Sequence, residues 1–222
     1  EQNINWAEEL ERAGVNVVYG FAGLKIHAKL CLVVRREPKG MRRYAHIGTG
    51  NYNASSAKIY TDLGLFTARD DICSDVQDLF NVMTGFGVID NYRRIFVSPN
   101  HLRANITRLI REEAEIHRAK GGGRIIMKCN QLVDQGIVRE LYEASRAGVK
   151  IECVVRGICS LRPGIKNVSE TISVHSIVGE LLEHARIYYF EHGGEPVMYV
   201  GSADMMTRNL NGRIEVLTPV LD

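Results

Sequence analysis

The two halves of the chain repeat one sequence pattern in the same order. In the first half, His27-Ala-Lys29 opens an apolar run, and Gly48-Thr-Gly-Asn51 follows it. In the second half, His184-Ala-Arg186 opens a similar run, and Gly201-Ser-Ala-Asp204 follows it. Such a repeat is typical of a duplicated fold, in which two related units share one set of packing rules. We therefore expect one site that is built from both halves.

Carboxylates and helix ends extend the repeat beyond these motifs. Asp62 lies 14 residues after Gly48, and Glu215 lies 14 residues after Gly201. Each half also opens with a helix that ends at a glycine and leads into an apolar strand, at Arg12-Ala-Gly14 and at Arg146-Ala-Gly148. The matched spacing favours a functional pair of histidines over the alternative, which is a duplicated fold whose histidines are only surface or core residues.

The repeated His-x-basic pattern predicts a site for phosphate. Side chains two residues apart on a strand point to the same face, so His27 would lie beside Lys29, and His184 beside Arg186. A neutral imidazole next to a fixed positive charge suits phosphoryl transfer, because the cation neutralises the non-bridging oxygens. The glycine-led turns offer further neutral donors to an anion. These donors are Thr49, Asn51, Asn53 and Ser202.

The two carboxylates are the predicted orienting groups of the histidines. A histidine nucleophile must be neutral and must hold one tautomer, so its second ring nitrogen needs an acceptor. By position within each half, we expect Asp62 to serve His27 and Glu215 to serve His184.

The order of predicted elements indicates an α/β fold, because strands alternate with helices. We expect two domains, over residues 1–97 and 98–222, of which the first is incomplete at its N-terminus. The predicted helices cover residues 3–13, 74–83, 98–120 and 136–147. The predicted strands cover residues 15–19, 27–34, 42–47, 59–68, 124–129, 149–156, 184–190, 197–200 and 213–217.

Composition excludes several classes of protein. The net charge of the 222 residues is only +2, so a polyanion site has to be local, and we expect no nucleic acid partner. The apolar stretches are far shorter than the ~20 residues that cross a bilayer. The five cysteines form no Cys-x-x-Cys pair, which argues against a zinc site or a disulfide framework. The chain does not begin with methionine, and we expect it to be a piece of a longer protein.

A His-x-Lys strand followed by a Gly-[Ser/Thr]-x-Asn turn, present twice, resembles the phospholipase D superfamily. Three positions depart from that pattern. Val34 stands where the superfamily has an aspartate, Arg186 replaces the second lysine, and Asp204 replaces the second asparagine. These departures argue against simple phosphodiester hydrolysis.

Four longer motifs resemble one branch of that superfamily, the ATP-dependent bacterial polyphosphate kinases. The resemblance spans essentially the whole chain and corresponds to the C-terminal catalytic part of that family. It implies two tandem phospholipase D-like α/β domains, each a mixed sheet flanked by helices. The motifs are Gly23-Leu-Lys-Ile-His-Ala-Lys-Leu30, Arg43-Tyr-Ala-His-Ile-Gly-Thr-Gly-Asn-Tyr-Asn53, Val155-Arg-Gly-Ile-Cys-Ser-Leu161 and Gly201-Ser-Ala-Asp-Met-Met-Thr-Arg-Asn209.

The resemblance also implies a mechanism. His27 would attack the γ-phosphate of ATP, become a phosphohistidine and pass the phosphate reversibly to polyphosphate. His184 matches the second essential histidine of the family, and Tyr60 and Arg156 match positions that contact the nucleotide. The family requires Mg²⁺, and the arginines associated with the metal would lie upstream of Glu1.

The implied partners are ATP, ADP, polyphosphate and the N-terminal domains of the same chain. We also expect a homo-oligomer in the bacterial cytoplasm, with a peripheral position at the inner membrane as an alternative location. Two rival functions stay open: a phospholipase D-like phosphodiesterase or nuclease, and an inert fragment that binds polyphosphate.

Overall fold

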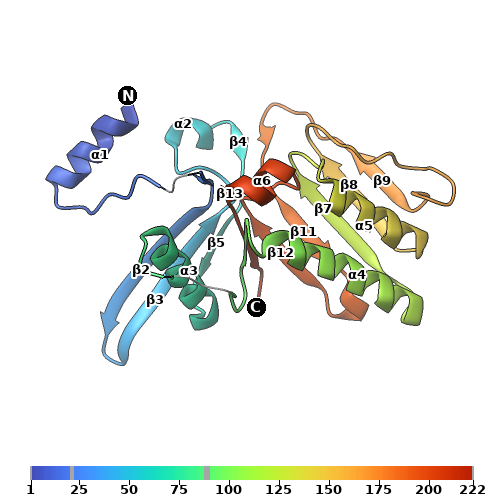
Figure 1. The fold of residues 1–222 in the computed structure, drawn as a ribbon, viewed down its shortest axis with the longest axis horizontal. Helices are drawn as coiled ribbons and strands as arrows, with labels where there is room; N and C mark the ends of the chain where they lie inside the picture. The colour runs from blue at the N-terminus through green and yellow to red at the C-terminus, as the bar shows by residue number, and fades with distance from the viewer. Residues whose placement is uncertain (1, 21–22, 88–90, 222) are drawn as a thin grey trace.

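The computed structural model describes residues 2–20, 23–87 and 91–221, with side chains described from Trp6 onward, and it has an α/β architecture. Two sheets lie side by side, and α1 stands apart from both of them (Figure 1). The helices are α1 (Gln2–Arg12), α2 (Ala54–Ala57), α3 (Asp70–Met83), α4 (Leu102–Lys120), α5 (Gln135–Arg146) and α6 (Thr207–Gly212).

The strands of the first half are β1 (Lys25–Ile26), β2 (Lys29–Glu37), β3 (Gly40–Gly48), β4 (Tyr60–Thr61) and β5 (Gly64–Thr67). The strands that follow are β6 (Phe96–Val97), β7 (Arg124–Cys129), β8 (Lys150–Val155), β9 (Ile172–His175), β10 (Leu182–Glu183), β11 (Ile187–Phe190), β12 (Val197–Gly201), β13 (Arg213–Ile214) and β14 (Val216–Pro219).

The larger sheet has seven strands in the order β6-β14-β12-β11-β7-β8-β9. It is mixed, because β7, β8 and β9 pair in parallel whereas the other neighbours are antiparallel. Along β7 and β8, every second residue is buried, as expected for a sheet with one face in the core. The apolar stripes of α4 and α5 contribute Ile106, Ile110 and Leu141 to that core.

The smaller sheet has three strands in the order β2-β3-β5, all antiparallel. The apolar stripe of α3 packs on one face of it, where Val76 and Leu79 join Ile47 in a second core cluster. The other face is exposed, and the side chain of Phe66 there is 82% accessible.

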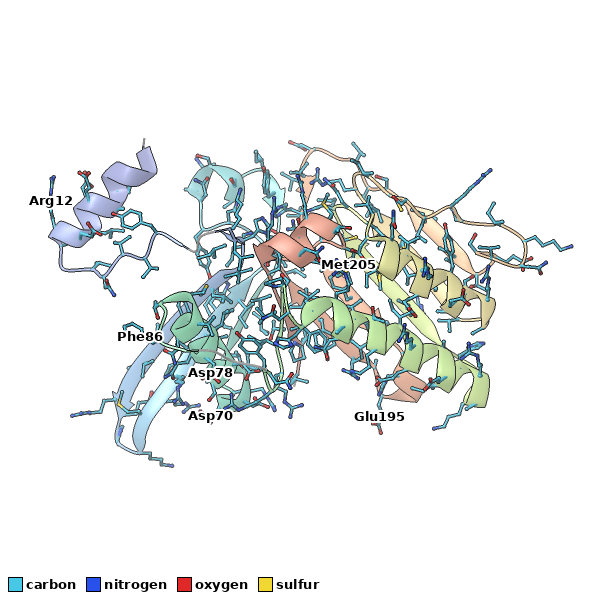
Figure 2. The ribbon with its side chains drawn as sticks, viewed as in Figure 1. Arg12, Asp70, Asp78, Phe86, Glu195 and Met205 are labelled. Atoms are coloured by element: carbon cyan, nitrogen blue, oxygen red, sulfur yellow. The ribbon has the colours of Figure 1, made fainter. Side chains whose placement is uncertain are left out.

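Two short parallel ladders connect the halves. β1 of the first half pairs with β13 of the second, and β10 of the second half pairs with β4 of the first. Each ladder contains only two residues per strand. Met205, labelled in Figure 2, lies in the region where the halves meet; it is fully buried, and its backbone forms a bridge with Leu132.

The predicted α/β class is confirmed, and the larger sheet is mixed and flanked by helices as expected, whereas the smaller sheet is purely antiparallel. The boundary predicted between residues 97 and 98 stays a prediction; β6 lies directly before it and pairs with β14. No helix among the described residues is long and apolar enough to cross a membrane.

Several strand predictions were wrong. Residues Val15–Tyr19 do not form a strand. Their counterpart by repeat, β8, pairs with β7 and β9, whereas residues 15–19 pair with no strand among the described residues. The predicted strands over residues 27–34 and 184–190 start only at Lys29 and Ile187, so each histidine lies in the break between two strands. The predicted strands over residues 59–68 and 213–217 are each divided, into β4 and β5 and into β13 and β14.

Candidate active site

The first histidine is held by the second half of the chain. The backbone N–H groups of His27 and Ala28 both donate to the carbonyl of Ile214, at 3.0 Å, at the end of the β1-β13 ladder. The next residue after Ile214 is Glu215, and its Oε2 lies 2.8 Å from Nδ1 of His27. The β1-β13 ladder therefore places the imidazole of His27 beside the carboxylate of Glu215.

The second histidine is held by the first half in the same way. The backbone N–H groups of His184 and Ala185 donate to the carbonyl of Thr61, at 3.2 and 3.0 Å, at the end of the β10-β4 ladder. The next residue is Asp62, and its Oδ1 lies 2.8 Å from Nδ1 of His184. Each half thus supplies the carboxylate that contacts the histidine of the other half.

The predicted pairing of Asp62 with His27 and of Glu215 with His184 was therefore wrong, although all four residues do form two pairs. The reason is the sheet topology. Each histidine follows a two-residue strand whose parallel partner is the strand before the carboxylate of the other half. Residues that follow paired parallel strands emerge at the same edge, so the partners cross between halves.

A hydroxyl supports each carboxylate. Thr49 Oγ1 donates to Asp62 Oδ1 at 2.6 Å and accepts from the N–H of Leu63. Ser202 Oγ donates to Glu215 Oε2 and accepts from the N–H of Val216. A hydroxyl has one proton, so neither group is a free phosphate donor. The predicted phosphate-binding role of both hydroxyls is corrected: they orient the carboxylates.

The two pairs differ in exposure. Glu215 has a completely buried side chain, whereas 21% of the His27 side chain is accessible. In the other pair the order is reversed, with 10% of His184 and 23% of Asp62 accessible. None of the described residues hydrogen-bonds to Nε2 of His27. A neutral His27 that donates its Nδ1 proton to Glu215 therefore presents a free Nε2 lone pair at the surface of the site.

The carboxyl group of Asp62 is held in its ionised form. Its burial raises the pKa, but the hydrogen bonds from His184 and Thr49, together with the charge of Arg186, outweigh this and lower the pKa below the ordinary value. Asp62 can therefore accept a hydrogen bond from His184 throughout the neutral range.

Lys29 is the free cation of the site. It is buried and donates to the carbonyl of His27, and it forms no ion pair among the residues described. Burial lowers its pKa to about 8, with the nearby charge of Arg186 acting in the same direction and that of Glu215 opposing it. Its ammonium group is thus available to phosphate and sensitive to the charge around it.

Arg186 is engaged through both terminal nitrogens of its guanidinium, whereas its buried Nε has no hydrogen-bond partner among the described residues. Its Nη1 donates to the carbonyls of His184 and Thr49, at 2.8 and 3.2 Å. Its Nη2 donates to Oδ2 of Asp204 at 3.0 Å, in an ion pair that is almost completely buried. The predicted role of Arg186 as a phosphate-binding counterpart of Lys29 does not match this geometry, because its charge is already paired.

The two asparagines of the first turn have different surroundings, and the predicted contact of their amide N–H groups with phosphate stays a prediction for both. Asn53 is the N-cap of α2, and its Oδ1 accepts from the N–H groups of Ser55 and Ser56 at 3.0 and 2.9 Å. Asn51 is exposed. The sequence Asn53-Ala-Ser-Ser-Ala57 fits a helix N-cap as well as it fits the predicted anion-binding turn.

Tyr60 and Arg156 line one groove of about 500 Å³ beside the second histidine. The ring of Tyr60 lies 4.8 Å from the ring of His184, between centroids. Arg156 donates from Nε to Oδ1 of Asn130 at 3.2 Å. The groove continues along residues 177–183, so it offers an aromatic ring, a guanidinium and an apolar wall next to His184.

Sequence reasoning missed three residues that hold the site together. Asp204 pairs with Arg186, and Asn130 contacts both Arg156 and Asp204. Ser98 Oγ donates to the carbonyl of Arg213 and accepts from the N–H of Glu215. Only Asp204 carried a signal in the sequence, as a departure from the repeated asparagine.

The side chains of the site suit an anionic substrate rather than a metal bound by the protein. Asp62 and Glu215 each serve a histidine, and no cluster of three or more potential metal ligands occurs among the described residues. Two groups of the site that have no carboxylate partner among the described residues are the buried ammonium of Lys29, which suits phosphate oxygens, and Nε2 of the partly accessible His27, which suits a phosphorus atom.

Comparison with known proteins agrees with this chemistry. Residues 95–222 match the family described as polyphosphate kinase C-terminal domain 2, and residues 1–89 match polyphosphate kinase C-terminal domain 1. The chain belongs to the polyphosphate kinase family. The predicted family is thereby confirmed.

Relatives in the polyphosphate kinase family align along the whole chain. It is 54% identical over 222 residues to polyphosphate kinase 1 of Chlorobaculum tepidum, and 54% identical over 221 residues to the polyphosphate kinase of Synechocystis. The crystal structure of polyphosphate kinase from Porphyromonas gingivalis superposes with a TM-score of 0.93 at 40% identity and covers 99% of the chain.

The chain is short beside these polyphosphate kinases. It spans 32% and 30% of the length of the two curated relatives and 34% of the P. gingivalis chain. The site described here is therefore the part of a polyphosphate kinase that its two C-terminal domains contribute.

Proposed function

We propose that the full-length protein containing this chain is a polyphosphate kinase that transfers the γ-phosphate of ATP to polyphosphate through a phosphohistidine at His27. The observation that carries the proposal is the asymmetry of the first pair. A fully buried Glu215 accepts from Nδ1 of His27, and the imidazole itself is reachable from solvent. This arrangement favours a nucleophilic Nε2 over a structural histidine.

The first step forms one bond and breaks one. The Nε2 lone pair attacks the γ-phosphorus, the N–P bond forms, the bond to the β,γ-bridging oxygen breaks, and ADP leaves with that electron pair. In the second step, a terminal oxygen of polyphosphate attacks the same phosphorus and the N–P bond breaks. In that step the electron pair of the N–P bond returns to Nε2. The overall transfer runs in either direction, because it exchanges a terminal phosphate oxygen of ADP for a terminal phosphate oxygen of polyphosphate, and the two have similar basicity. Mg²⁺ arrives with the nucleotide as part of the substrate.

The chain's own residues supply charge and orientation for these steps. Lys29 stabilises the negative charge that the transferred group carries in the transition state. Glu215 stabilises the imidazolium that forms when His27 is phosphorylated, because the Nδ1 proton stays shared with the carboxylate. His184, held by Asp62, is the second imidazole of the site and assists as a proton donor to the leaving oxygen.

The nucleotide is expected in the groove beside His184. An adenine ring finds the aromatic face of Tyr60 there, and the ATP phosphates find the guanidinium of Arg156. The remaining walls of the binding site, and residues associated with Mg²⁺, are expected in parts of the protein outside this chain. Homo-oligomerisation and a cytoplasmic or peripheral membrane location stay predictions.

The proposal is tested with purified full-length protein and MgATP. A polyphosphate kinase converts ATP to ADP and produces acid-insoluble polyphosphate, and the His27→Ala variant produces none. Release of inorganic phosphate without polymer, or cleavage of a bis(p-nitrophenyl) phosphate reporter without nucleotide, would instead identify a phospholipase D-like hydrolase. Binding of polyphosphate with no turnover of any substrate would indicate an inert binding protein.

A further inference from the structure

The basic residue after each histidine and the last residue of each glycine-led turn have different contacts in the two halves. Lys29 and Asn51 occupy these positions in the first half, and Arg186 and Asp204 occupy them in the second. Both basic residues donate to the carbonyl of the histidine two residues earlier, so their placement is equivalent. Their partners are not equivalent: Asn51 is exposed, whereas Asp204 is buried against the guanidinium.

Both carboxylate oxygens of Asp204 accept hydrogen bonds from buried or part-buried groups. Oδ2 accepts from Nη2 of Arg186 at 3.0 Å. Oδ1 accepts from the backbone N–H of Asn130 at 2.7 Å, and the N–H of Gln131 also points to it at 3.4 Å. A carboxylate that is buried and bonded on both oxygens is rigid, and it fixes the groups that donate to it.

The guanidinium reaches His184 from this fixed position. Nη1 of Arg186 bonds the carbonyl of His184 and lies 3.2 Å from each of the two ring nitrogens. It also bonds the carbonyl of Thr49, whose hydroxyl donates to Asp62. Arg186 therefore touches the second imidazole directly and touches the residue that orients the imidazole's carboxylate.

We infer that Asp204 is a positioning residue for His184, and that it acts by holding and neutralising Arg186. This inference rests on the proposed polyphosphate kinase function and assigns different tasks to the halves. In the first half, an unpaired Lys29 leaves its charge for the transferred phosphate. In the second half, the Arg186–Asp204 pair carries no net charge, so this half supplies an oriented imidazole rather than a second phosphate-binding cation.

Asp204 also links the second histidine to the nucleotide groove. The backbone of Asn130 donates to Asp204, and the side chain of Asn130 accepts from Nε of Arg156. In Asp204→Asn, the amide oxygen can still accept from the backbone N–H of Asn130, so the loop that positions Arg156 is retained and the contact with Arg186 is weakened. A neutral asparagine at 204 retains one acceptor, but it leaves the buried guanidinium without its counter-charge, which is strongly unfavourable.

The test compares Asp204→Asn with the double variant Arg186→Lys/Asp204→Asn in the full-length protein. The double variant installs the Lys/Asn pair of the first half, with a lysine that reaches the same backbone carbonyl. We expect Asp204→Asn to lower kcat for polyphosphate synthesis by about 100-fold, within the range typical of a lost acid–base group. KM for ATP should change by less than about threefold, and the double variant should recover most of the lost kcat.

Asp134→Asn is the matched control. Asp134 is a buried carboxylate that accepts from Arg103 at 2.8 Å and caps α5, so its loss affects folding outside the site. We expect this control to lower the thermal unfolding midpoint with kcat within about threefold of wild type. If the single and double Asp204 variants lose the same kcat, the carboxylate supports only the loop after β7, and the inference fails.

Phosphoenzyme labelling separates this inference from the proposed function. His27 in Asp204→Asn should still reach the wild-type end point of label from γ-labelled ATP, because His27, Glu215 and Lys29 are unchanged. Unchanged labelling and unchanged kcat in Asp204→Asn would overturn the positioning role alone. Absence of label in the wild-type protein would overturn the phosphohistidine mechanism instead.

Discussion

Nδ1 of His27 lies 2.8 Å from Oε2 of Glu215, a residue 188 positions later in the chain. The mirror contact joins His184 to Asp62, at the same distance and over 122 positions. Neither half can orient its own histidine, so each half is incomplete without the other. The crossed pairs give a duplicated fold a reason to keep its two copies in one chain and in fixed contact.

The crossed pairing predicts which carboxylate controls formation of the phosphoenzyme. Glu215→Gln keeps the shape of the side chain but allows the wrong tautomer of His27, because the amide can donate to Nδ1. We expect the rate of phosphoenzyme formation to fall by about 10³- to 10⁴-fold, as in other histidine–carboxylate pairs. Rapid-quench labelling of the full-length protein measures this rate.

Asp62→Asn is the comparison for that experiment, because Asp62 serves the second histidine. We expect it to slow labelling as well, because His184 assists the leaving oxygen of ADP, but by less than Glu215→Gln does, since the nucleophile itself is unchanged. A larger loss of labelling in Asp62→Asn than in Glu215→Gln would contradict the crossed arrangement.

The ionisation of Lys29 predicts an alkaline limit to activity. Its pKa is lowered to about 8, chiefly by burial, so the ammonium is charged below that pH and neutral above it. The charged form binds phosphate; kcat/KM should therefore fall as the pH rises through about 8. Lys29→Arg keeps a cation at high pH, and the second half shows that arginine fits the equivalent position.

The control for this prediction is the profile of Lys29→Arg itself between pH 6 and pH 10. We expect its alkaline decline to move upward by more than about one pH unit, since arginine stays protonated. An unchanged alkaline limb in this variant would assign the decline to another group.

The close approach of Asp62 to Gly50 predicts a sensitive glycine. A Cβ atom at Gly50 would overlap the carboxyl group of Asp62, so Gly50→Ala must displace that side chain from His184. We expect a loss of turnover similar to that of Asp62→Asn. Gly87→Ala is the control, because a Cβ there meets only ordinary contacts. Full activity in Gly50→Ala would show that the position of Asp62 is not required.

The buried hydroxyl of Ser202 predicts a stability effect. Ser202→Ala leaves the buried N–H of Val216 without the acceptor it has in the structure, and leaves Oε2 of Glu215 with His27 as its one remaining side-chain donor among the described residues. A buried hydrogen-bonding group left without its partner costs about 1–3 kcal/mol, so thermal unfolding should shift to lower temperature. Ser176→Ala, at an exposed hydroxyl, should have little effect. Equal midpoints for both variants would contradict the supporting role of Ser202.

The repeat in the sequence predicted the components of the site but not their partners. His27, His184, Asp62 and Glu215 were all identified from matched spacing, and the structure joins them in two pairs. Spacing along the chain contains no information on whether a strand pairs within its own half. That choice is made by two ladders of two residues each, which are too short to leave a pattern in the sequence.

Small polar residues were the second source of error. Thr49 and Ser202 in glycine-led turns match an anion-binding loop as well as they match hydrogen-bond donors to a buried carboxylate. Asn53 matches a helix cap equally well. Only burial and the position of the neighbouring strand decide between these uses, and both depend on tertiary structure. Asp204, by contrast, differed from the repeat, and the difference reflects a real change of partner.

The most direct test of the account locates the phosphate on the protein. Full-length wild type and His27→Ala are each incubated with γ-labelled ATP and Mg²⁺, quenched in base, and digested for mass spectrometry. The account predicts an acid-labile, base-stable phosphate on the peptide that contains His27 in the wild type, and none in the variant. Label on His184 instead, or label that persists in His27→Ala, would contradict the assignment of His27 as the nucleophile.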